Sequence, residues 1–335
     1  MQTNDFHFEL PSKLIARKPT YPRDRSKLMV IERKTRQIFH SSFHQLSEWI
    51  TPRDLLILNN SKVIPARLFA EKGKIELLLL EETSPNHWLA IGKPARKLLP
   101  GNKYRLEKRG TDLKGPEFEI LRTLEDGSRV MRFYQKPDLK TFGELPLPPY
   151  IQKAREASDE DTFQNEDFSD YQTTYAQKEG SVAAPTAGLH FTSELLNQFN
   201  HQFITLHVGL GTFRPVKAKE IKNHQMHRER YWVPESLSEE VKLAERVIAV
   251  GTTSARVLES NPKLNSGPGD TNIFIHPPYS FKRVDSLITN FHLPGSTLIM
   301  LIAAFMGHDL QKKAYQEAID KKYRFYSYGD AMLIL

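Results

Sequence analysis

The chain has 335 residues, 39% hydrophobic and 26% charged, and its 47 basic and 40 acidic residues give a net charge of +7. This composition predicts a soluble globular protein of about two domains, for which a nucleic-acid partner is plausible. The chain contains no cysteine, which excludes disulfides, thiolate nucleophiles and Cys-ligated clusters. Because the longest apolar run, Leu298–Met306, is too short to span a bilayer and no apolar signal segment opens the chain, we expect a cytoplasmic protein without a membrane partner.

The first 60 residues have the pattern of an α/β domain. Short strands are predicted over 27–32 and 37–41, and a helix over 42–50, where apolar residues recur with helical spacing. The run Asp54–Leu58 (DLLIL) is continuously apolar, which is typical of a buried parallel strand. Such a strand needs neighbouring strands on both sides, so it predicts a sheet completed by later parts of the chain.

The pattern changes between Arg67 and Pro149. Short strand-forming runs recur there without helical spacing, and glycines or charged turns separate them, which predicts a small all-β unit, most simply a barrel. The proline-rich segment LPLPPYI, residues 145–151, is expected to be a rigid extended connection. The strand-forming runs are 75–80, 88–91, 103–106, 117–121 and 129–133.

The α/β pattern returns after a highly charged stretch, 153–171, which we interpret as a mobile acidic loop before a helix. The simplest fold class is therefore α/β, with an α/β domain (1–66 plus 150–335) and an inserted small all-β, barrel-like domain (67–149). Tandem domains are the alternative. In the last part, strands are predicted over 203–208, 246–250 and 286–289, and helices over 192–200, 238–245, 254–260, 296–306 and 310–322.

Standard nucleotide and metal motifs are missing or weak. The chain has no GxxxxGK[ST] phosphate loop, and Gly209-Leu210-Gly211 lacks the third glycine of a dinucleotide-binding turn. His224 and His227 are spaced i, i+3 near Glu229, but no third metal ligand is obvious, so a substrate or phosphate contact is favoured and no metal site is expected.

Five other segments concentrate polar groups near predicted strand ends or helix starts, where α/β folds bind ligands. The amides that open a helix after residue 250 form a ready anion site. The aromatic residues of the last segment either stack on bases or form a core strand. The segments are SVAAPTAGLHFT (181–192), TLHVGLGTFRPV (205–216), VGTTSAR (250–256), ITNFHLP (288–294) and YRFYSYGDAMLI (323–334).

All of these segments except VGTTSAR, together with FHFELPSKLIA, RDRSKLMV, NNSKVIPARL and LPLPPYI, resemble the S-adenosylmethionine:tRNA ribosyltransferase-isomerase (QueA) family of queuosine biosynthesis. The resemblance runs in order from Phe6 to Ile334. This sequence departs from the family pattern at Asn60-Ser61-Lys62, where Asp, Thr and Arg are usual, at Gly295 and Arg228, and at Ser169-Asp170. The substrate contacts that the family pattern implies at Lys62 and Gly295 therefore do not carry over to this sequence, and an altered substrate preference is left open.

The resemblance implies an α/β domain with an inserted barrel and a specific reaction. The ribosyl part of S-adenosylmethionine is transferred to 7-aminomethyl-7-deazaguanine at the wobble position of tRNA and isomerised. The products are epoxyqueuosine-tRNA, adenine and methionine. The implied partners are S-adenosylmethionine, consumed as a substrate and not retained as a cofactor, and a tRNA with a GUN-type anticodon; we expect a monomer or a weak homodimer.

This reaction needs a base, and without cysteine histidine is the default group whose pKa lies near neutrality. The candidate catalytic residues are His190, His207 and His292. The candidate substrate-binding residues are Arg214, Thr252, Thr253, Arg256, Asn290, Tyr328 and Asp330. The candidate tRNA-binding residues are Lys62, Arg67, Lys93, Arg96, Lys97, His224, His227 and Arg228, and Lys103, Arg105, Lys108 and Arg109 extend the basic cluster of the insert.

Two other classes of protein remain open. A non-catalytic RNA-binding protein would use the barrel as its platform, and it would explain the charge and the aromatic residues but not the polar segments at strand ends. A methyltransferase would use S-adenosylmethionine but release S-adenosylhomocysteine and no adenine.

Overall fold

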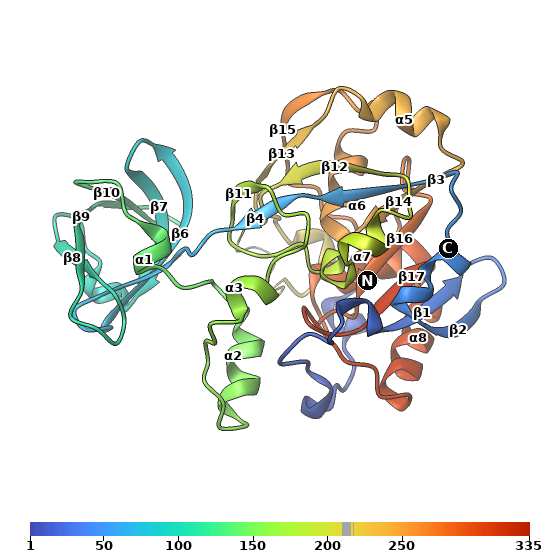
Figure 1. Ribbon diagram of the computed structural model, residues 1–335, viewed down its shortest axis with the longest axis horizontal. Helices are drawn as coiled ribbons and strands as arrows, with labels where there is room; N and C mark the ends of the chain where they lie inside the picture. The colour runs from blue at the N-terminus through green and yellow to red at the C-terminus, as the bar shows by residue number, and fades with distance from the viewer. Residues whose placement is uncertain (210–215, 217) are drawn as a thin grey trace. The chain divides into compact units, whose positions relative to one another are not determined.

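A computed structural model describes residues 1–209, 216 and 218–335 (Figure 1). The chain divides into a larger unit, Met1–Lys62, Pro149–Lys178 and Ala184–Leu335, and a smaller unit, Val63–Pro148 and Glu179–Ala183. The larger unit holds a mixed sheet with helices and the smaller one a closed barrel, so the expected α/β class with an all-β barrel is confirmed. The sequence analysis had not assigned the segment Glu179–Ala183 to the insert.

Within the described residues, the larger unit contains a nine-stranded sheet in the order β15-β13-β12-β3-β14-β16-β17-β1-β2 (Figure 1). Strands β12, β3, β14 and β16 are parallel neighbours, and Leu56 of β3 lies between His201 of β12 and Ile248 of β14. The strands are β1 (Lys27–Glu32), β2 (Gln37–Ser42), β3 (Asp54–Asn59), β12 (His201–Leu206), β13 (Glu229–Val233), β14 (Arg246–Val250), β15 (Gly267–Thr271), β16 (Ser286–Asn290) and β17 (Ala331–Ile334).

Strand β3 shows why the run DLLIL is continuously apolar. All six of its residues are buried, because β12 and β14 flank it and both faces of the sheet are covered. On one face Leu56 and Leu58 belong to the same core cluster as Phe43 and Phe191. The core of the larger unit therefore forms where the sheet meets the short helical segments around these two phenylalanines.

The longest helices of the larger unit lie in its carboxyl-terminal part. Helix α6 packs against β14, β3 and β12, and the apolar α7 packs against α8. No helix in the described ranges is both long and apolar enough to cross a membrane. The helices of the chain are α1 (Leu139–Phe142), α2 (Pro149–Glu156), α3 (Asp167–Asp170), α4 (Ser193–Leu196), α5 (Leu237–Leu243), α6 (Thr252–Ser260), α7 (Thr297–Met306) and α8 (His308–Asp320).

The smaller unit, whose residues are all described, is a closed six-stranded antiparallel barrel in the order β10-β7-β6-β5-β8-β9. Closure removes the exposed sheet edges that favour aggregation. Buried and half-buried residues alternate along the first part of β6, as expected for a strand with one face in a core. Its strands are β5 (Arg67–Ala70), β6 (Ile75–Ser84), β7 (His87–Lys93), β8 (Lys103–Glu107), β9 (Lys114–Thr123) and β10 (Arg129–Phe133); β4 (Ser61–Val63) and β11 (Lys178–Ser181) pair separately.

Three local expectations were wrong. Pro149 opens helix α2 in place of continuing an extended connection, because proline suits the first helical position, where no N–H is needed. The acidic stretch 153–171 is not a plain loop: Asp167 lies buried with Arg155, whose Nη1 is 2.7 Å from its Oδ2. The helix expected over 192–200 is only the short α4.

The sequence analysis also missed strands β13 and β15. The β15 segment GPGDT has weak strand propensity, and it becomes a strand because it pairs with β13 at the edge of the sheet, where Gly and Pro are tolerated.

Candidate active site

The carboxyl ends of the four parallel strands meet at one edge of the sheet. His207 follows β12, Asn59 ends β3, Thr252 and Thr253 follow β14, and Asn290 ends β16. Neighbouring strands are about 4.8 Å apart, so this row spans roughly 14 Å, the width of one ligand site. In open α/β sheets this edge is where ligands bind.

Other polar segments reach the same edge because they precede strands that start there. Strand β17 is antiparallel to β16, and β1 is parallel to β17, so the residues that precede both strands lie at this edge. These include Ser26 before β1, and Tyr328 and Asp330 before β17. The topology thus gathers polar segments that are up to 300 residues apart in sequence, as the bond from Lys27 N to Asp330 Oδ1 at 3.2 Å illustrates.

His190 lies at this edge with both ring nitrogens occupied. Its Nδ1 is 2.8 Å from Ser26 Oγ, and its Nε2 is 3.0 Å from Asn290 Nδ2. Because Asn290 Oδ1 accepts a hydrogen bond from Thr186 Oγ1, its amide nitrogen donates to His190, so Nε2 is the acceptor and Nδ1 carries the hydrogen. Burial, reinforced by two nearby arginines, lowers the pKa of His190 to about 3. The imidazole is therefore neutral at neutral pH.

His207 is in a different environment. Its backbone N donates to Arg230 O at 3.0 Å, which fixes the residue beside β13, and its side chain is half-buried. Its Nδ1 is buried, with no hydrogen-bond partner among the residues that the structure describes. Burial and then the charge of Arg230 lower its pKa from the usual 6.5. Unlike His190, His207 therefore has a ring nitrogen left for a ligand within the described structure.

Helix α6 contributes two further groups to this corner. It begins after Gly251, whose φ of +89° favours glycine and whose missing side chain leaves the helix uncapped. Thr253 Oγ1 is buried and, within the described part of the chain, has no hydrogen-bond partner. Arg256, one turn further on, is buried and pairs with Glu229. The corner formed by His207, Thr253 and Arg256 therefore holds polar atoms without a hydrogen-bond partner among the described residues.

His292 is not in this group. Its Nε2 is 2.7 Å from Thr289 Oγ1, and its backbone N donates to Tyr315 Oη at 3.0 Å. Thr289 and Asn290 are consecutive strand residues and point to opposite faces of the sheet. His292 thus lies on the face opposite His190, where burial lowers its pKa to about 3. The structure does not bring the three histidines together.

Tyr328 and Asp330 are held by contacts within the protein. The Tyr328 hydroxyl donates to Asp167 at 3.4 Å, and Asp330 accepts hydrogen bonds from Arg324 and from the backbone of Lys27. The aromatic residues around them are buried, in agreement with the core interpretation of this segment and not with a base-stacking surface. Arg214 lies outside the described residues.

Most candidate tRNA-binding cations of the barrel have acidic partners. Arg67 lies 2.8 Å from Glu76 and 3.5 Å from Glu144, and Lys93 lies 3.0 Å from Glu76. Lys97 pairs with Glu71, and further pairs join Arg105 to Glu117 and Arg109 to Glu144. Arg96 is exposed.

The remaining candidates for tRNA contact belong to the larger unit. Lys62 lies in β4 and has contacts within the protein. In the segment before β13, the ring of His224 packs on Phe274 with centroids 5.3 Å apart, His227 is exposed, and Arg228 pairs with Asp270 at 2.5 Å. No group of three potential metal ligands occurs in the described ranges.

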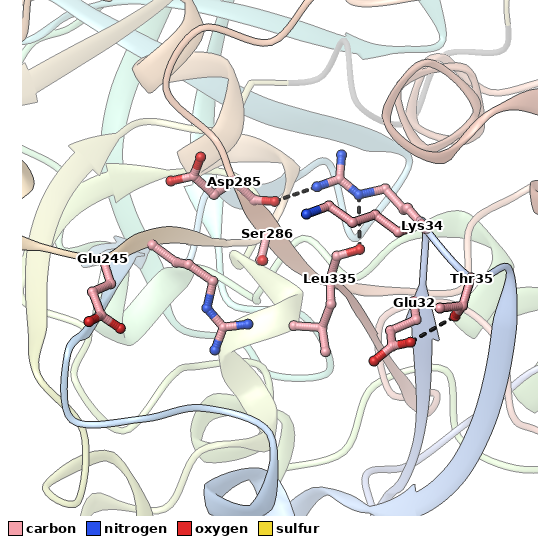
Figure 2. Close-up of a pocket in the computed structure, with 9 residues that line it drawn as sticks. Glu32, Lys34, Thr35, Glu245, Asp285, Ser286 and Leu335 are labelled. Atoms are coloured by element: carbon pink, nitrogen blue, oxygen red, sulfur yellow. Dashed lines mark hydrogen bonds between the residues drawn. The ribbon is translucent and has the colours of Figure 1, made fainter.

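A cavity of about 740 Å³ lies at the opposite edge of the sheet, where β14 and β16 begin (Figure 2). Its arginines are engaged by the protein: Arg33 donates to the carbonyl oxygens of Leu335 at 3.0 Å and Asp285 at 2.5 Å, and Arg246 pairs with Asp54. None of the candidate site residues that the structure describes lines this cavity.

Sequence reasoning missed three residues that the structure places at the polar edge: Ser26, Thr186 and Glu229. Ser26 and Thr186 lie inside segments that were singled out, but their partners are distant in sequence. Glu229 was considered only beside a histidine pair, and its charge complementarity to Arg256, which is 27 residues away, gives no sequence signal.

An α/β sheet with polar groups at the carboxyl ends of its parallel strands, interrupted by an inserted barrel, is typical of the ligand-binding α/β class of proteins. The queuosine biosynthesis protein family matches residues 3–334 of this chain. The chain belongs to this family, which confirms the resemblance drawn from its motifs.

Relatives with the same name cover the whole chain. The S-adenosylmethionine:tRNA ribosyltransferase-isomerases of Thermoanaerobacter sp. (strain X514) and Thermotoga maritima are each 46% identical, over 356 and 353 residues, with 100% of both chains covered. That of Clostridioides difficile is 44% identical over 355 residues, with the same coverage. The crystal structure of an S-adenosylmethionine tRNA ribosyltransferase from Thermotoga maritima matches with a TM-score of 0.54 and 36% identity, over 99% of this chain and 100% of that one.

Proposed function

We propose that this enzyme transfers and isomerises the ribosyl moiety of S-adenosylmethionine onto 7-aminomethyl-7-deazaguanine at the wobble position of tRNA. The products are epoxyqueuosine-tRNA, adenine and methionine. The observation that carries the proposal is the 46% identity, over the full length of both chains, to enzymes named for this activity. The polar edge of the sheet supplies groups that fit the reaction.

The reaction starts with removal of a C5′ proton, which the neighbouring sulfonium acidifies. We assign this step to His207, because its Nδ1 is unpartnered within the described structure and its side chain is half-buried. A neutral imidazole is the form that accepts a proton, and the lowered pKa of His207 keeps it neutral at physiological pH. The ribose then opens as adenine departs, and the amine carried by tRNA adds at C4′. Ring closure and epoxide formation expel methionine.

His190 is suited to holding the site in shape. Its two ring nitrogens join Ser26, before β1, to Asn290, at the end of β16. With a pKa of about 3 and no unoccupied nitrogen, it is a poor base. Thr252 and Thr253 are placed to contact substrate hydroxyls, and Arg256 to contact the carboxylate of the methionyl group.

Recognition of a tRNA with a GUN-type anticodon is assigned to exposed cations. Arg96, Lys103 and Lys108 are exposed residues of the barrel unit, and His227 is exposed in the larger unit. Such contacts release counterions, so tRNA affinity is expected to fall steeply as salt rises from 50 to 200 mM, a span over which several phosphate contacts cost about 10³-fold or more. S-adenosylmethionine is consumed as a substrate and no other cofactor is required; the enzyme acts in the cytoplasm as a monomer or weak homodimer.

The decisive experiment is to incubate the protein with S-adenosylmethionine and substrate tRNA and to identify the small-molecule product. Free adenine together with methionine is the expected result. S-adenosylhomocysteine without adenine would instead indicate a methyltransferase. Binding of tRNA without turnover of S-adenosylmethionine would indicate a non-catalytic RNA-binding protein.

A further inference from the structure

We infer that Glu229 is a positioning residue that holds Arg256 so that one guanidinium nitrogen faces the α-carboxylate of S-adenosylmethionine. The inference rests on the proposed function, because it names the contact that recognises one part of that substrate. It adds a residue that neither the motifs nor the relatives' names assign to the site.

Glu229 opens β13 and is 6% exposed. Its Oε2 accepts a hydrogen bond from Arg256 Nη1, and its Oε1 accepts one from the backbone N of Gly209 at 3.0 Å. A buried carboxylate is costly unless its oxygens are paired, and here both are. Glu229 therefore links helix α6 to the turn that follows His207, and it sets the position of both.

Arg256, also 6% exposed, is fixed at two of its three nitrogens. Its Nε donates to Ile273 O at 3.3 Å and its Nη1 to Glu229, whereas the buried Nη2 has no hydrogen-bond partner in the described ranges. Because the guanidinium is planar and rigid, holding two nitrogens fixes the direction of the third. An unsatisfied buried donor is destabilising, so Nη2 is explained by an acceptor that arrives with a ligand.

The chemistry around Nη2 favours a small anion. Thr253 is three residues before Arg256, so the two side chains share a face of α6, and Thr253 Oγ1 is likewise unpartnered within the described structure. The uncapped amino terminus of α6 adds positive potential. A carboxylate at the end of a small molecule can enter such a buried position, whereas a phosphodiester of tRNA carries a nucleoside on each side. The methionyl carboxylate is the group that fits.

The test compares S-adenosylmethionine with decarboxylated S-adenosylmethionine, which lacks only the carboxylate. Binding is measured by calorimetry, and kcat and KM by adenine release, for the full-length wild type and the variants Glu229→Gln and Glu229→Ala. Glu259→Gln is the matched control. Glu259 is also buried and lies on α6, but it accepts hydrogen bonds from Tyr279 Oη and from the backbone of residues 282–284, away from the start of the helix.

The wild type and Glu259→Gln should prefer the carboxylated substrate by about 10- to 100-fold, the range for a hydrogen bond to a charged group. Glu229→Ala should lose most of this preference through a higher KM for S-adenosylmethionine, with a smaller change in kcat and none in its affinity for the decarboxylated compound. Glu229→Gln, which keeps one acceptor oxygen, should fall between the two.

If either folded Glu229 variant keeps the wild-type preference, the inference is overturned. It is also overturned if the wild type does not distinguish the two compounds, or if the Glu229 variants lose affinity for tRNA and not for S-adenosylmethionine. Should Glu229→Ala fail to fold, as judged by circular dichroism, the isosteric Glu229→Gln decides. A wild type that binds S-adenosylmethionine but releases no adenine would contradict the proposed function and leave the binding comparison intact.

Discussion

His190 and His207 lie at the same edge of one sheet, yet their surroundings differ in every respect that matters to proton transfer. His190 is 4% exposed and both of its ring nitrogens are hydrogen-bonded, to Ser26 and Asn290. His207 is half-buried, and its Nδ1 has no partner in the described part of the structure. Burial lowers the pKa of both histidines, and it lowers that of His190 to about 3.

The comparison leads to a testable criterion: a catalytic histidine keeps a ring nitrogen for the substrate, whereas a structural histidine has both ring nitrogens hydrogen-bonded within the protein. An imidazole whose two nitrogens are both hydrogen-bonded within the protein stabilises the fold and holds its neighbours in place. It cannot accept a proton without breaking one of these hydrogen bonds. An imidazole with a buried nitrogen that lacks a hydrogen-bond partner destabilises the folded protein, and a ligand that bonds to this nitrogen removes the cost. Substitutions at these positions and a change of pH test this division of roles.

Replacing His207, whose Nδ1 has no partner within the described structure, should have the largest effect on the reaction. His207→Ala is expected to lower the rate of adenine release by about 10²- to 10⁴-fold, the usual contribution of a general base, while S-adenosylmethionine still binds. The measurement is single-turnover adenine release together with the dissociation constant. A rise in KM with an unchanged kcat would show that His207 positions the substrate and does not take the proton.

The buried histidines should make the fold sensitive to acid. His190 and His292 titrate near 6.5 when unfolded and near 3 when folded, so the unfolded state binds more protons between these values. The free energy of unfolding should therefore fall as pH drops from 7 to 5, by up to about 1.4 kcal/mol per pH unit for each histidine. Urea unfolding at pH 7, 6 and 5 measures the slope, and a variant with both histidines replaced by Gln should show a shallower one.

Replacing His190, whose two ring nitrogens are both hydrogen-bonded, should affect the stability of the fold more than the rate of adenine release. His190→Ala removes the hydrogen-bond partner of Ser26 Oγ and of Asn290 Nδ2. Each of these two polar groups left unpaired should reduce the free energy of unfolding by about 1–3 kcal/mol. Adenine release by the folded fraction should fall far less than in His207→Ala. Chemical denaturation and single-turnover rates at a temperature where the variant is folded provide the two numbers. Equal losses of rate in the two variants would contradict the division of roles.

The smallest effect is expected at Thr253. Thr253→Val keeps the shape and removes the hydroxyl, so it should cost no stability, because the buried Oγ1 has no partner within the described structure. It should weaken S-adenosylmethionine binding by about 10-fold, the value of one hydrogen bond of roughly 1.4 kcal/mol, and Thr253→Ser should restore it. A loss of stability without loss of affinity would place Thr253 in the core and not in the site.

The sequence by itself determined the fold class, the runs that become most strands, and the family. The run DLLIL predicted a buried parallel strand, because only a strand covered on both faces can be apolar at every position. The runs that become β6 to β10 predicted a small all-β unit, because glycines or charged turns separate short strand-forming runs without helical spacing. These features are local, so a single segment is enough to reveal them. The polar segments likewise marked strand ends before any geometry was known.

Only the tertiary structure decided what each polar residue does. Ser26 and His190 are 164 residues apart, and Glu229 and Arg256 are 27 apart, so no spacing rule relates them. The same applies to Asp167, whose acidic segment suggested a loop although Arg155 buries it. The burial of a side chain and the hydrogen-bond partners of its polar atoms depend on which distant segments the sheet brings together. Burial sets the pKa of a histidine, and the hydrogen bonds decide which of its ring nitrogens a substrate can reach. That is why residue types could be chosen from the sequence, whereas their roles required the fold.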